Sequence, residues 1–285
     1  MEVNMEEKII SESLTKDFRH HLAREERSDS TIEKYVKEIL RFAQWMKGLP
    51  VTKEEVSRWK EHLLKEKFAP ATVNVRLAAL NSFFDFCGWQ DCRVKSLKLK
   101  KKMFRDSSRE LSREEYERLL KAARDTGKDN LMLIIETICS TGIRVSEIKY
   151  ITVESVGDGK AEIFLKGKIR TILIPNKLCH KLRKFAQKNK ITSGEIFLSE
   201  RGRPIDRRTI WAAMKSICHE AGVESSKVFP HNLRHLFARC FYRTCRDISK
   251  LADVLGHSCV ETTRIYLIST GEEHTRTLEK MRLIL

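Results

Sequence analysis

The chain has 285 residues, which is long enough for one or two domains with sizeable hydrophobic cores. Hydrophobic residues make up 41% of the sequence and charged residues 33%, a balance typical of a soluble globular protein. The first residues lack a basic segment followed by an apolar run, and no later stretch reaches transmembrane length. We therefore expect a cytoplasmic protein rather than a secreted or membrane protein.

The chain carries 55 basic residues against 39 acidic ones, a formal net charge of +16. An excess of this size favours a polyanion as the partner, although a merely soluble basic surface is the alternative. The charge is clustered, because residues 93–105, RVKSLKLKKKMFR, contain seven basic residues and no acidic one. The eight cysteines form no C-x-x-C pair, so we expect most of them to be core thiols in a reducing compartment and no zinc site.

Helical patterning dominates the first ninety or so residues. Ser30 with Glu33, and Thr52 with Glu55, predict capping boxes at the start of two amphipathic helices. Pro70 opens a further helix, and an earlier one is expected around residues 18–22. Together these segments predict a compact four-helix unit.

The fourth helix of this unit carries three polar side chains among its apolar positions: Asn74, Arg76 and Asn81. They are either contacts to a nucleic-acid groove or the solvated face of the helix, and the residues alone slightly favour the solvated face. The basic segment after this helix has the composition of a linker that neutralises phosphates without reading bases.

The second half of the chain opens with a predicted capping box, Ser112 and Glu115. A strongly apolar helix follows and ends at Gly142, and Arg144 begins the next segment. Two strand-like runs, residues 161–165 and 170–174, then flank a basic hairpin tip. Helices are expected over residues 178–188 and 208–221.

The segment 230–266 contains residues that ordinary packing does not require. Pro230 opens a helix whose apolar stripe runs through Leu233, Leu236, Phe237, Cys240 and Phe241. At about 100° per residue, His231 and Arg234 fall on a shared outward face, with His235 roughly opposite the stripe.

A second helix in this segment is capped by Asp247 and ends at Gly256, directly before His257. Ser258 and Glu261 predict the capping box of a third helix, and Tyr266 is expected two turns along it. This arrangement places His257 where a helix N-terminus favours a phosphate.

Three stretches in this half of the chain resemble the signatures of one family. HNLRHLFA, LGHS and TTRIY occur in the order and spacing of the tyrosine recombinases, the phage-integrase and Xer-type family. STGIRVSEI is similar to the first arginine motif of that family, and KGKIRTILIP resembles a shortened form of its lysine hairpin. The resemblance covers nearly the whole chain and is most specific between Arg144 and Tyr266.

The resemblance implies a mainly α fold. A four-helix, SAM-like core-binding domain would span residues 1–92, a basic linker 93–108, and a catalytic domain with a small antiparallel sheet 109–285. It implies site-specific cutting and rejoining of DNA through a 3′-phosphotyrosyl intermediate. It also favours DNA contact over a solvated face for the polar residues of the N-terminal unit. The DNA-binding residues expected on this basis are Arg76, Lys100, Lys101, Lys102 and Lys168.

The chemistry of phosphodiester transesterification matches the residue types of the predicted site: Arg144, Lys166, His231, Arg234, His257 and Tyr266. Two guanidinium groups can hold the non-bridging oxygens of the phosphate, and a histidine can accept the proton of the attacking tyrosine. We assign these roles to Arg144 with Arg234, and to His231.

His257 is expected to donate to a phosphate oxygen. A hairpin lysine, either Lys166 or Lys168, would protonate the leaving 5′ oxygen, with Lys166 preferred because it precedes the glycine. This interpretation requires no cofactor and no metal.

The expected partners are double-stranded DNA recombination sites and further copies of the chain, as a homotetramer on two sites. The tail after Tyr266 predicts a short helix with Leu278, Met281 and Leu285 on one side, which docks on its own domain or, as the resemblance implies, on a neighbouring protomer. Two other classes stay open at this point: a type IB topoisomerase that relaxes DNA, and a DNA-binding regulator without catalytic activity.

Overall fold

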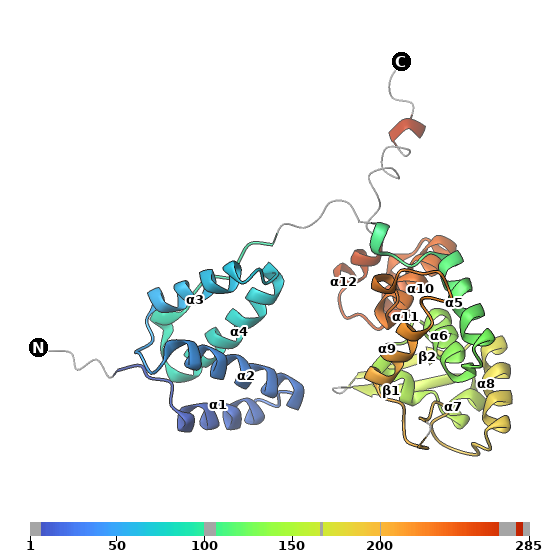
Figure 1. The fold of residues 1–285 in the computed structure, drawn as a ribbon, viewed down its shortest axis with the longest axis horizontal. Helices are drawn as coiled ribbons and strands as arrows, with labels where there is room; N and C mark the ends of the chain where they lie inside the picture. The colour runs from blue at the N-terminus through green and yellow to red at the C-terminus, as the bar shows by residue number, and fades with distance from the viewer. Residues whose placement is uncertain (1–6, 100–106, 166–167, 200, 268–277, 282–285) are drawn as a thin grey trace, which may run out of the picture. The chain divides into compact units, whose positions relative to one another are not determined.

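The computed structural model describes residues 7–99, 107–165, 168–199, 201–267 and 278–281. The chain divides into two compact units, residues 1–101 and 102–285, so the boundary falls within the segment predicted as a linker. Figure 1 shows that both units are mainly helical. None of the described helices is long and apolar enough to cross a membrane, and the structure gives all eight cysteines as free thiols.

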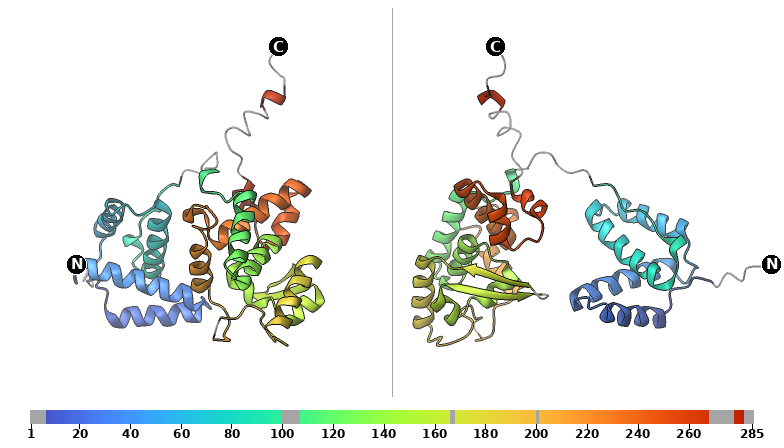
Figure 2. Two further views of the ribbon diagram at one scale, coloured as in Figure 1. Left: turned by 45° about the vertical axis from the view of Figure 1, so that its right-hand side comes forward. Right: turned by 180° about the vertical axis from the view of Figure 1, so that it is seen from behind.

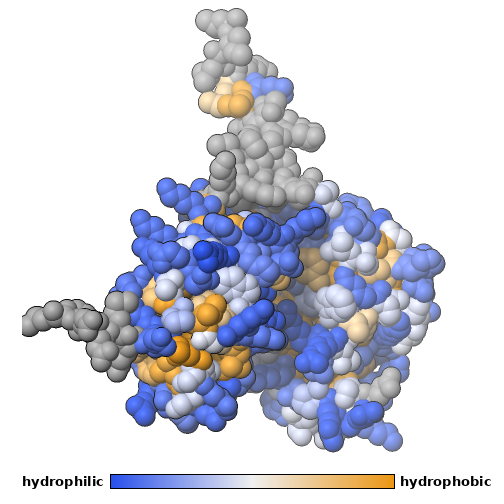
Figure 3. Space-filling model, turned by 60° about the vertical axis from the view of Figure 1, so that its left-hand side comes forward, coloured by the Kyte–Doolittle hydropathy of each residue, from blue (hydrophilic) through white to orange (hydrophobic). Residues whose placement is uncertain are grey.

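Four helices build the first unit, as the sequence predicted: α1 (Glu12–Arg24), α2 (Asp29–Met46), α3 (Lys53–Lys65) and α4 (Pro70–Cys87). A short 3-10 turn, η1 (Gln90–Cys92), follows them. The helices enclose an aromatic core in which Phe18, Phe42, Phe83 and Phe84 are fully buried. Figure 3 shows one face of the molecule as mostly hydrophilic, in keeping with the high content of charged residues.

The predicted caps of this unit have different outcomes. Thr52 caps α3 by accepting a hydrogen bond from the backbone N–H of Glu55 at 3.2 Å. The side chain of Glu55 pairs with Arg58 at 2.5 Å, so only half of the predicted box forms. The box predicted for Ser30 and Glu33 is wrong, because α2 begins one residue before Ser30. Glu33 instead forms an ion pair with Arg19 of α1, at 2.5 Å. A long-range partner has therefore taken the carboxylate that the local pattern assigned to a cap.

The two asparagines of α4 hold the chain that follows the helix. Asn74 donates to the carbonyl of Leu97 at 2.9 Å and accepts from its N–H at 2.7 Å. Asn81 does the same with Val94, at 2.9 and 3.2 Å. Each side-chain amide thus bonds to the backbone as a neighbouring strand would. The prediction of a merely solvated face is wrong for these two residues, and contact with a nucleic-acid groove stays a prediction.

Arg76, the third polar residue of this helix, lies against the protein. Its Nε is 3.4 Å from Glu38, and its guanidinium sits 4.0 Å from the centre of the Phe68 ring. Its side chain is 13% exposed. Protein groups therefore already hold Arg76, and its contact with DNA stays a prediction.

The second unit contains most of the chain's elements. Its helices are α5 (Arg113–Asp125), α6 (Asp129–Thr141), α7 (Val153–Asp158), α8 (Asn176–Lys188), α9 (Arg207–Ser216), α10 (Pro230–Cys245), α11 (Ile248–Leu255) and α12 (Val260–Arg264). The 3-10 turns are η2 (Ser107–Arg109), η3 (Val145–Tyr150), η4 (Ser225–Lys227) and η5 (Ile265–Leu267). The predicted capping box of Ser112 and Glu115 is present at the start of α5.

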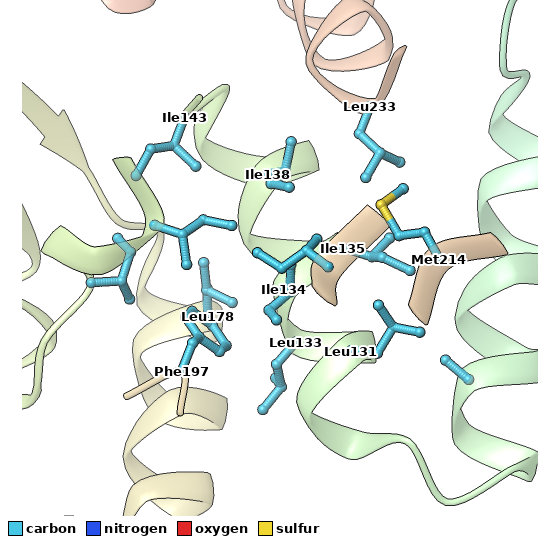
Figure 4. Close-up of a cluster of buried hydrophobic side chains, with 14 of the residues drawn as sticks. Leu131, Leu133, Ile134, Ile135, Ile138, Ile143, Leu178, Phe197, Met214 and Leu233 are labelled. Carbon is cyan, nitrogen blue, oxygen red and sulfur yellow. The ribbon is translucent and has the colours of Figure 1, made fainter. Parts of the chain in front are cut away.

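Helix α6 lies at the centre of this unit and supplies much of its core. Figure 4 shows Leu131, Leu133, Ile134, Ile135 and Ile138 packed among side chains from the surrounding elements. Helix α10 packs against α6 through Leu233, which is fully buried. The apolar run recognised in the sequence is thus the core helix on which the segment 230–266 rests.

The two strands form an antiparallel hairpin, β1 (Lys160–Leu165) and β2 (Lys168–Leu173), with Leu165 opposite Lys168. The right-hand view of Figure 2 shows the two strands side by side, with helices of the second unit around them. Its side chains alternate: Ile163 and Ile172 are buried, whereas Phe164 and Ile169 are more than 60% exposed. Arg170 therefore shares the inward face with Ile172.

Three element predictions in this unit were inaccurate. The helix expected over residues 208–221 ends at Ser216. Helix α12 begins at Val260 with Cys259 as its N-cap residue, so Ser258 and Glu261 form no capping box. Tyr266 lies in η5, after α12 has ended. Most of the predicted tail helix, Leu285 included, lies outside the described residues.

Candidate active site

Arg234 is buried, with 2% of its surface exposed, whereas the helical angle predicted an outward position beside His231. One nitrogen of its guanidinium donates to the carbonyl of Gly142, which ends α6, and another to that of Leu255, at 2.7 Å, which ends α11. Carbonyls at helix C-termini lack partners within their own helix and carry partial negative charge. Two helix ends from distant parts of the chain thus stabilise this buried charge.

His257 lies directly against Arg234. Its Nε2 is 3.1 Å from a guanidinium nitrogen, and its Nδ1 is 2.9 Å from the hydroxyl of Thr263. Because an arginine only donates, Nε2 is the acceptor and Nδ1 carries the proton. Burial, followed by the positive charges of Arg234 and Arg144, lowers the pKa of His257 to about 4. The ring is therefore neutral at physiological pH in the protein without DNA.

Tyr266 is 5% exposed and is surrounded by three histidine rings. Its ring centre lies 4.4 Å from that of His235, 5.7 Å from that of His257 and 6.0 Å from that of His231. Burial lowers the pKa of Arg234 to about 10, and the Tyr266 hydroxyl beside the guanidinium opposes that lowering. The tyrosine thus lies beside the arginine of its own chain.

His231 is exposed at the start of α10, where it is next to the ring of His235 at 4.7 Å. Neighbouring groups remove part of the water around this exposed ring. This loss of water, followed by the charges of Arg234 and Arg144, lowers the pKa of His231. A histidine that remains neutral at physiological pH can accept a proton. Sequence reasoning placed His235 on the same side of the helix but gave it no role, although its ring is nearest to Tyr266.

Arg144 is the N-cap residue of η3 and is oriented by Glu147, which is 1% exposed. The guanidinium lies 2.8 Å from one carboxylate oxygen, and the backbone N–H of Arg144 donates to the other at 2.9 Å. Burial would raise the pKa of Glu147, but these bonds and the charge of Arg170 bring it below its ordinary value. Glu147 was not among the predicted site residues, although its spacing of three residues from Arg144 was a usable signal.

The structure says less about the remaining predicted residues. Lys166 and the three linker lysines, Lys100, Lys101 and Lys102, lie outside the described residues. Lys168 begins β2, so the structure places its backbone at the hairpin turn. Five of the six predicted catalytic residues are described, and they come from the N-cap of η3, from α10, from the turn after α11, and from η5. Within the described part of the chain, no cluster of three or more metal-binding side chains occurs.

Comparison with known proteins identifies the family. A model described as "Phage integrase family" matches residues 109–273, and one described as "Phage integrase, N-terminal SAM-like domain" matches residues 15–91. The chain belongs to the phage integrase family. It is a tyrosine recombinase of the Xer-like group, an enzyme that cuts and rejoins DNA at specific sites. This conclusion sets aside the topoisomerase and regulator alternatives.

Relatives of this recombinase match along nearly their whole length. Tyrosine recombinase XerA of Thermococcus kodakarensis is 30% identical, over 94% of this chain and 95% of its own. Tyrosine recombinase XerC of Roseiflexus castenholzii is 28% identical, over 87% and 86% of the two chains. The predicted resemblance is thus confirmed for both halves of the sequence.

Solved structures share the recombinase fold. A lambda integrase dimer bound to a COC′ core site aligns with a TM-score of 0.73 and 18% identity, over 91% of this chain and 78% of that one. The XerA recombinase aligns with a TM-score of 0.53 and 22% identity, over 96% and 99% of the chains. The predicted fold class, helical with an N-terminal SAM-like domain and a small antiparallel sheet, is confirmed.

Proposed function

We propose that Tyr266 is the nucleophile of this recombinase. Its oxygen forms a bond to the scissile phosphorus while the bond to the 5′ oxygen breaks, which leaves a 3′-phosphotyrosyl link and a free 5′ hydroxyl. The reverse reaction with the 5′ hydroxyl of another strand rejoins the DNA. The observation that carries this proposal is the position of Tyr266, next to Arg234 and within 6.0 Å of three histidine rings.

His231 accepts the proton of the tyrosine in this proposal. A tyrosine hydroxyl is protonated at neutral pH, so its attack requires a base. The lowered pKa of His231 favours the unprotonated ring. A bound DNA phosphate brings negative charge to the ring, which raises its affinity for the proton as the tyrosine attacks.

Arg144, Arg234 and His257 bind the phosphate. Two guanidinium groups can hold the non-bridging oxygens and stabilise the charge that accumulates on them in the transition state. His257 Nε2 accepts from Arg234 in the absence of DNA. A phosphate at Arg234 replaces that bond and raises the pKa of His257, so that the protonated ring donates to a phosphate oxygen.

The leaving 5′ oxygen receives its proton from the hairpin, from Lys166 or Lys168. Lys168 is the first residue of β2, and Lys166 follows the last residue of β1 in the sequence but lies outside the described residues. Arg76, Lys100, Lys101, Lys102 and Lys168 are also the proposed contacts of the chain with the DNA backbone. Phosphate contacts of this kind position the enzyme without reading the sequence.

The substrate is a pair of double-stranded DNA sites that four copies of the chain bring together. A related lambda integrase has been solved as a tetramer on a Holliday junction, and XerH as a complex with its difH substrate. These assemblies belong to the relatives. For this chain, the exposed Leu278 and Met281 of the tail support a contact between protomers.

The test begins with the DNA that becomes covalently attached to the protein. Wild-type protein is incubated with fragmented DNA from its host, adducts are recovered, and sequencing of their ends identifies the site. On an oligonucleotide with that site, Tyr266→Phe is expected to bind with unchanged affinity but to form no adduct. An adduct mapped to Tyr242 or Tyr35 would refute the assignment of Tyr266.

A further inference from the structure

Arg170 joins the hairpin to two other elements through an ion pair and a hydrogen bond. Arg170 of β2 lies 2.8 Å from a carboxylate oxygen of Glu147 in η3. The same guanidinium donates to the carbonyl of Val254 in α11, at 2.9 Å. The side chain of Arg170 is 12% exposed, and that of Glu147 is 2% exposed. One planar group thus connects three elements that are far apart in the sequence.

The carboxylate that Arg170 holds is the one that orients Arg144. One oxygen of Glu147 accepts from the guanidinium of Arg144 at 2.8 Å. The other accepts from the backbone N–H of Arg144 and from Arg170, at 2.9 and 2.8 Å. Without Arg170, a nearly buried carboxylate loses a charged partner and is held only by the residue that it orients, Arg144. The direction of the Arg144 guanidinium therefore depends on Arg170.

The stem of Arg170 also packs against the turn that presents His257. Gly256 has a φ of +64°, and a Cβ at this position would lie 2.3 Å from Cδ of Arg170. The close approach requires a glycine. Because Gly256 immediately precedes His257, the position of Arg170 also constrains the turn that presents the imidazole.

We propose that Arg170 is a positioning residue that fixes Arg144 and the His257 turn around the scissile phosphate. The inference rests on the proposed function of these two residues. Arg170 acts through Glu147 and the backbone and touches no reacting atom. A lysine cannot replace it, because a single ammonium lacks the planar fork that reaches Glu147 and Val254 together.

The experiment compares Arg170→Lys with wild type on two substrates under single-turnover, saturating conditions. One substrate has a normal scissile phosphodiester, and the other a methylphosphonate, in which an uncharged methyl group replaces one non-bridging oxygen. We expect Arg170→Lys to slow cleavage of the phosphodiester about 30-fold, because a misdirected Arg144 stabilises less charge in the transition state. On the methylphosphonate, which carries less charge, the defect should shrink to about threefold, as it should for Arg144→Ala.

The controls separate positioning from folding. Arg183 of α8 also donates to backbone carbonyls, of Val156 and Gly157, but lies outside this ion-pair network, so Arg183→Lys should not distinguish the two substrates. Glu147→Gln preserves the shape of the pair, removes its charge and must show the same substrate dependence as Arg170→Lys. Melting temperature and DNA affinity are measured for every variant.

Two results would overturn the inference. Equal slowing of both substrates by Arg170→Lys would mean that Arg170 only supports the fold, and unchanged rates would mean that it has no role in catalysis. Failure of the proposed function has a separate signature, since wild-type protein would then form no adduct at Tyr266 on either substrate.

Discussion

Burial, followed by the charges of Arg234 and Arg144, lowers the pKa of His257 and keeps its ring neutral, and this makes the DNA-free protein sensitive to acid. The unfolded chain takes up this proton near pH 6.5, whereas the folded chain does so near pH 4. The free energy of unfolding should therefore fall as the pH decreases from 6.5 towards 4, by at most about 2 kcal/mol at pH 5. Chemical denaturation of wild type and His257→Gln at pH 7.5 and 5.0 measures this loss, which should be smaller in the variant.

His180, an exposed histidine of α8, provides the matched control. His180→Gln should retain the acid sensitivity of wild type. The explanation fails if His257→Gln loses as much stability as wild type between the two pH values. Addition of site DNA should reduce the loss of stability that wild type shows between pH 7.5 and 5.0, since a phosphate beside the His257 ring favours its protonated form.

Sequence reasoning identified the types of the active-site residues but not how the protein holds them. The helical angle placed Arg234 outward beside His231, yet its partners are carbonyls at the ends of α6 and α11. Such partners become visible only when distant segments fold together. For the same reason Arg170 was recognised as a strand residue, and its ion pair with Glu147 was not predicted.

At the scale of elements, the hairpin contains two candidates for the general acid, Lys166 and Lys168. Lys166→Ala and Lys168→Ala can each be compared on a normal phosphodiester and on one with a 5′-bridging sulfur, which leaves without needing a proton. The lysine that supplies the proton should give a loss of at least about 100-fold on the normal substrate and little loss on the sulfur substrate. If both variants slow both substrates equally, neither lysine is the acid.

Elements with strong periodic patterns were predicted well, and their ends less well. The box of Ser112 and Glu115 formed, whereas those of Ser30 with Glu33 and Ser258 with Glu261 did not. A capping pattern spans only four residues, and a distant partner such as Arg19 can take its carboxylate. Helix existence therefore followed from the sequence more reliably than helix boundaries.

For the whole molecule, we expect the tail to be needed for assembly on two DNA sites but not for binding to one. Removal of residues 275–285 is expected to leave binding to a single DNA site within about twofold, because tail contacts between protomers form only when further copies assemble. Pairing of two sites and recombination should fall at least about tenfold. Gel-shift and recombination assays measure the two activities. Leu278→Lys with Met281→Lys, which changes only the two exposed apolar side chains, should reproduce the loss.

A truncated chain that pairs and recombines sites normally would show that the tail makes no contact between protomers. Impaired binding to a single site would instead mean that the tail packs on its own domain.

The asparagines of α4 have a consequence for how the two units share one DNA molecule. Asn74 and Asn81 bind the chain as far as Leu97 to the first unit, and Asn232 of α10 donates to the carbonyl of Arg109 in the second. The tether between Leu97 and Arg109 therefore spans at most about 40 Å, at about 3.5 Å per residue. Once one unit has bound DNA, so short a tether keeps the other at an effective concentration in the millimolar range. Two units that each bind DNA weakly can thus bind it tightly together. A longer tether would weaken the overall affinity without altering any contact.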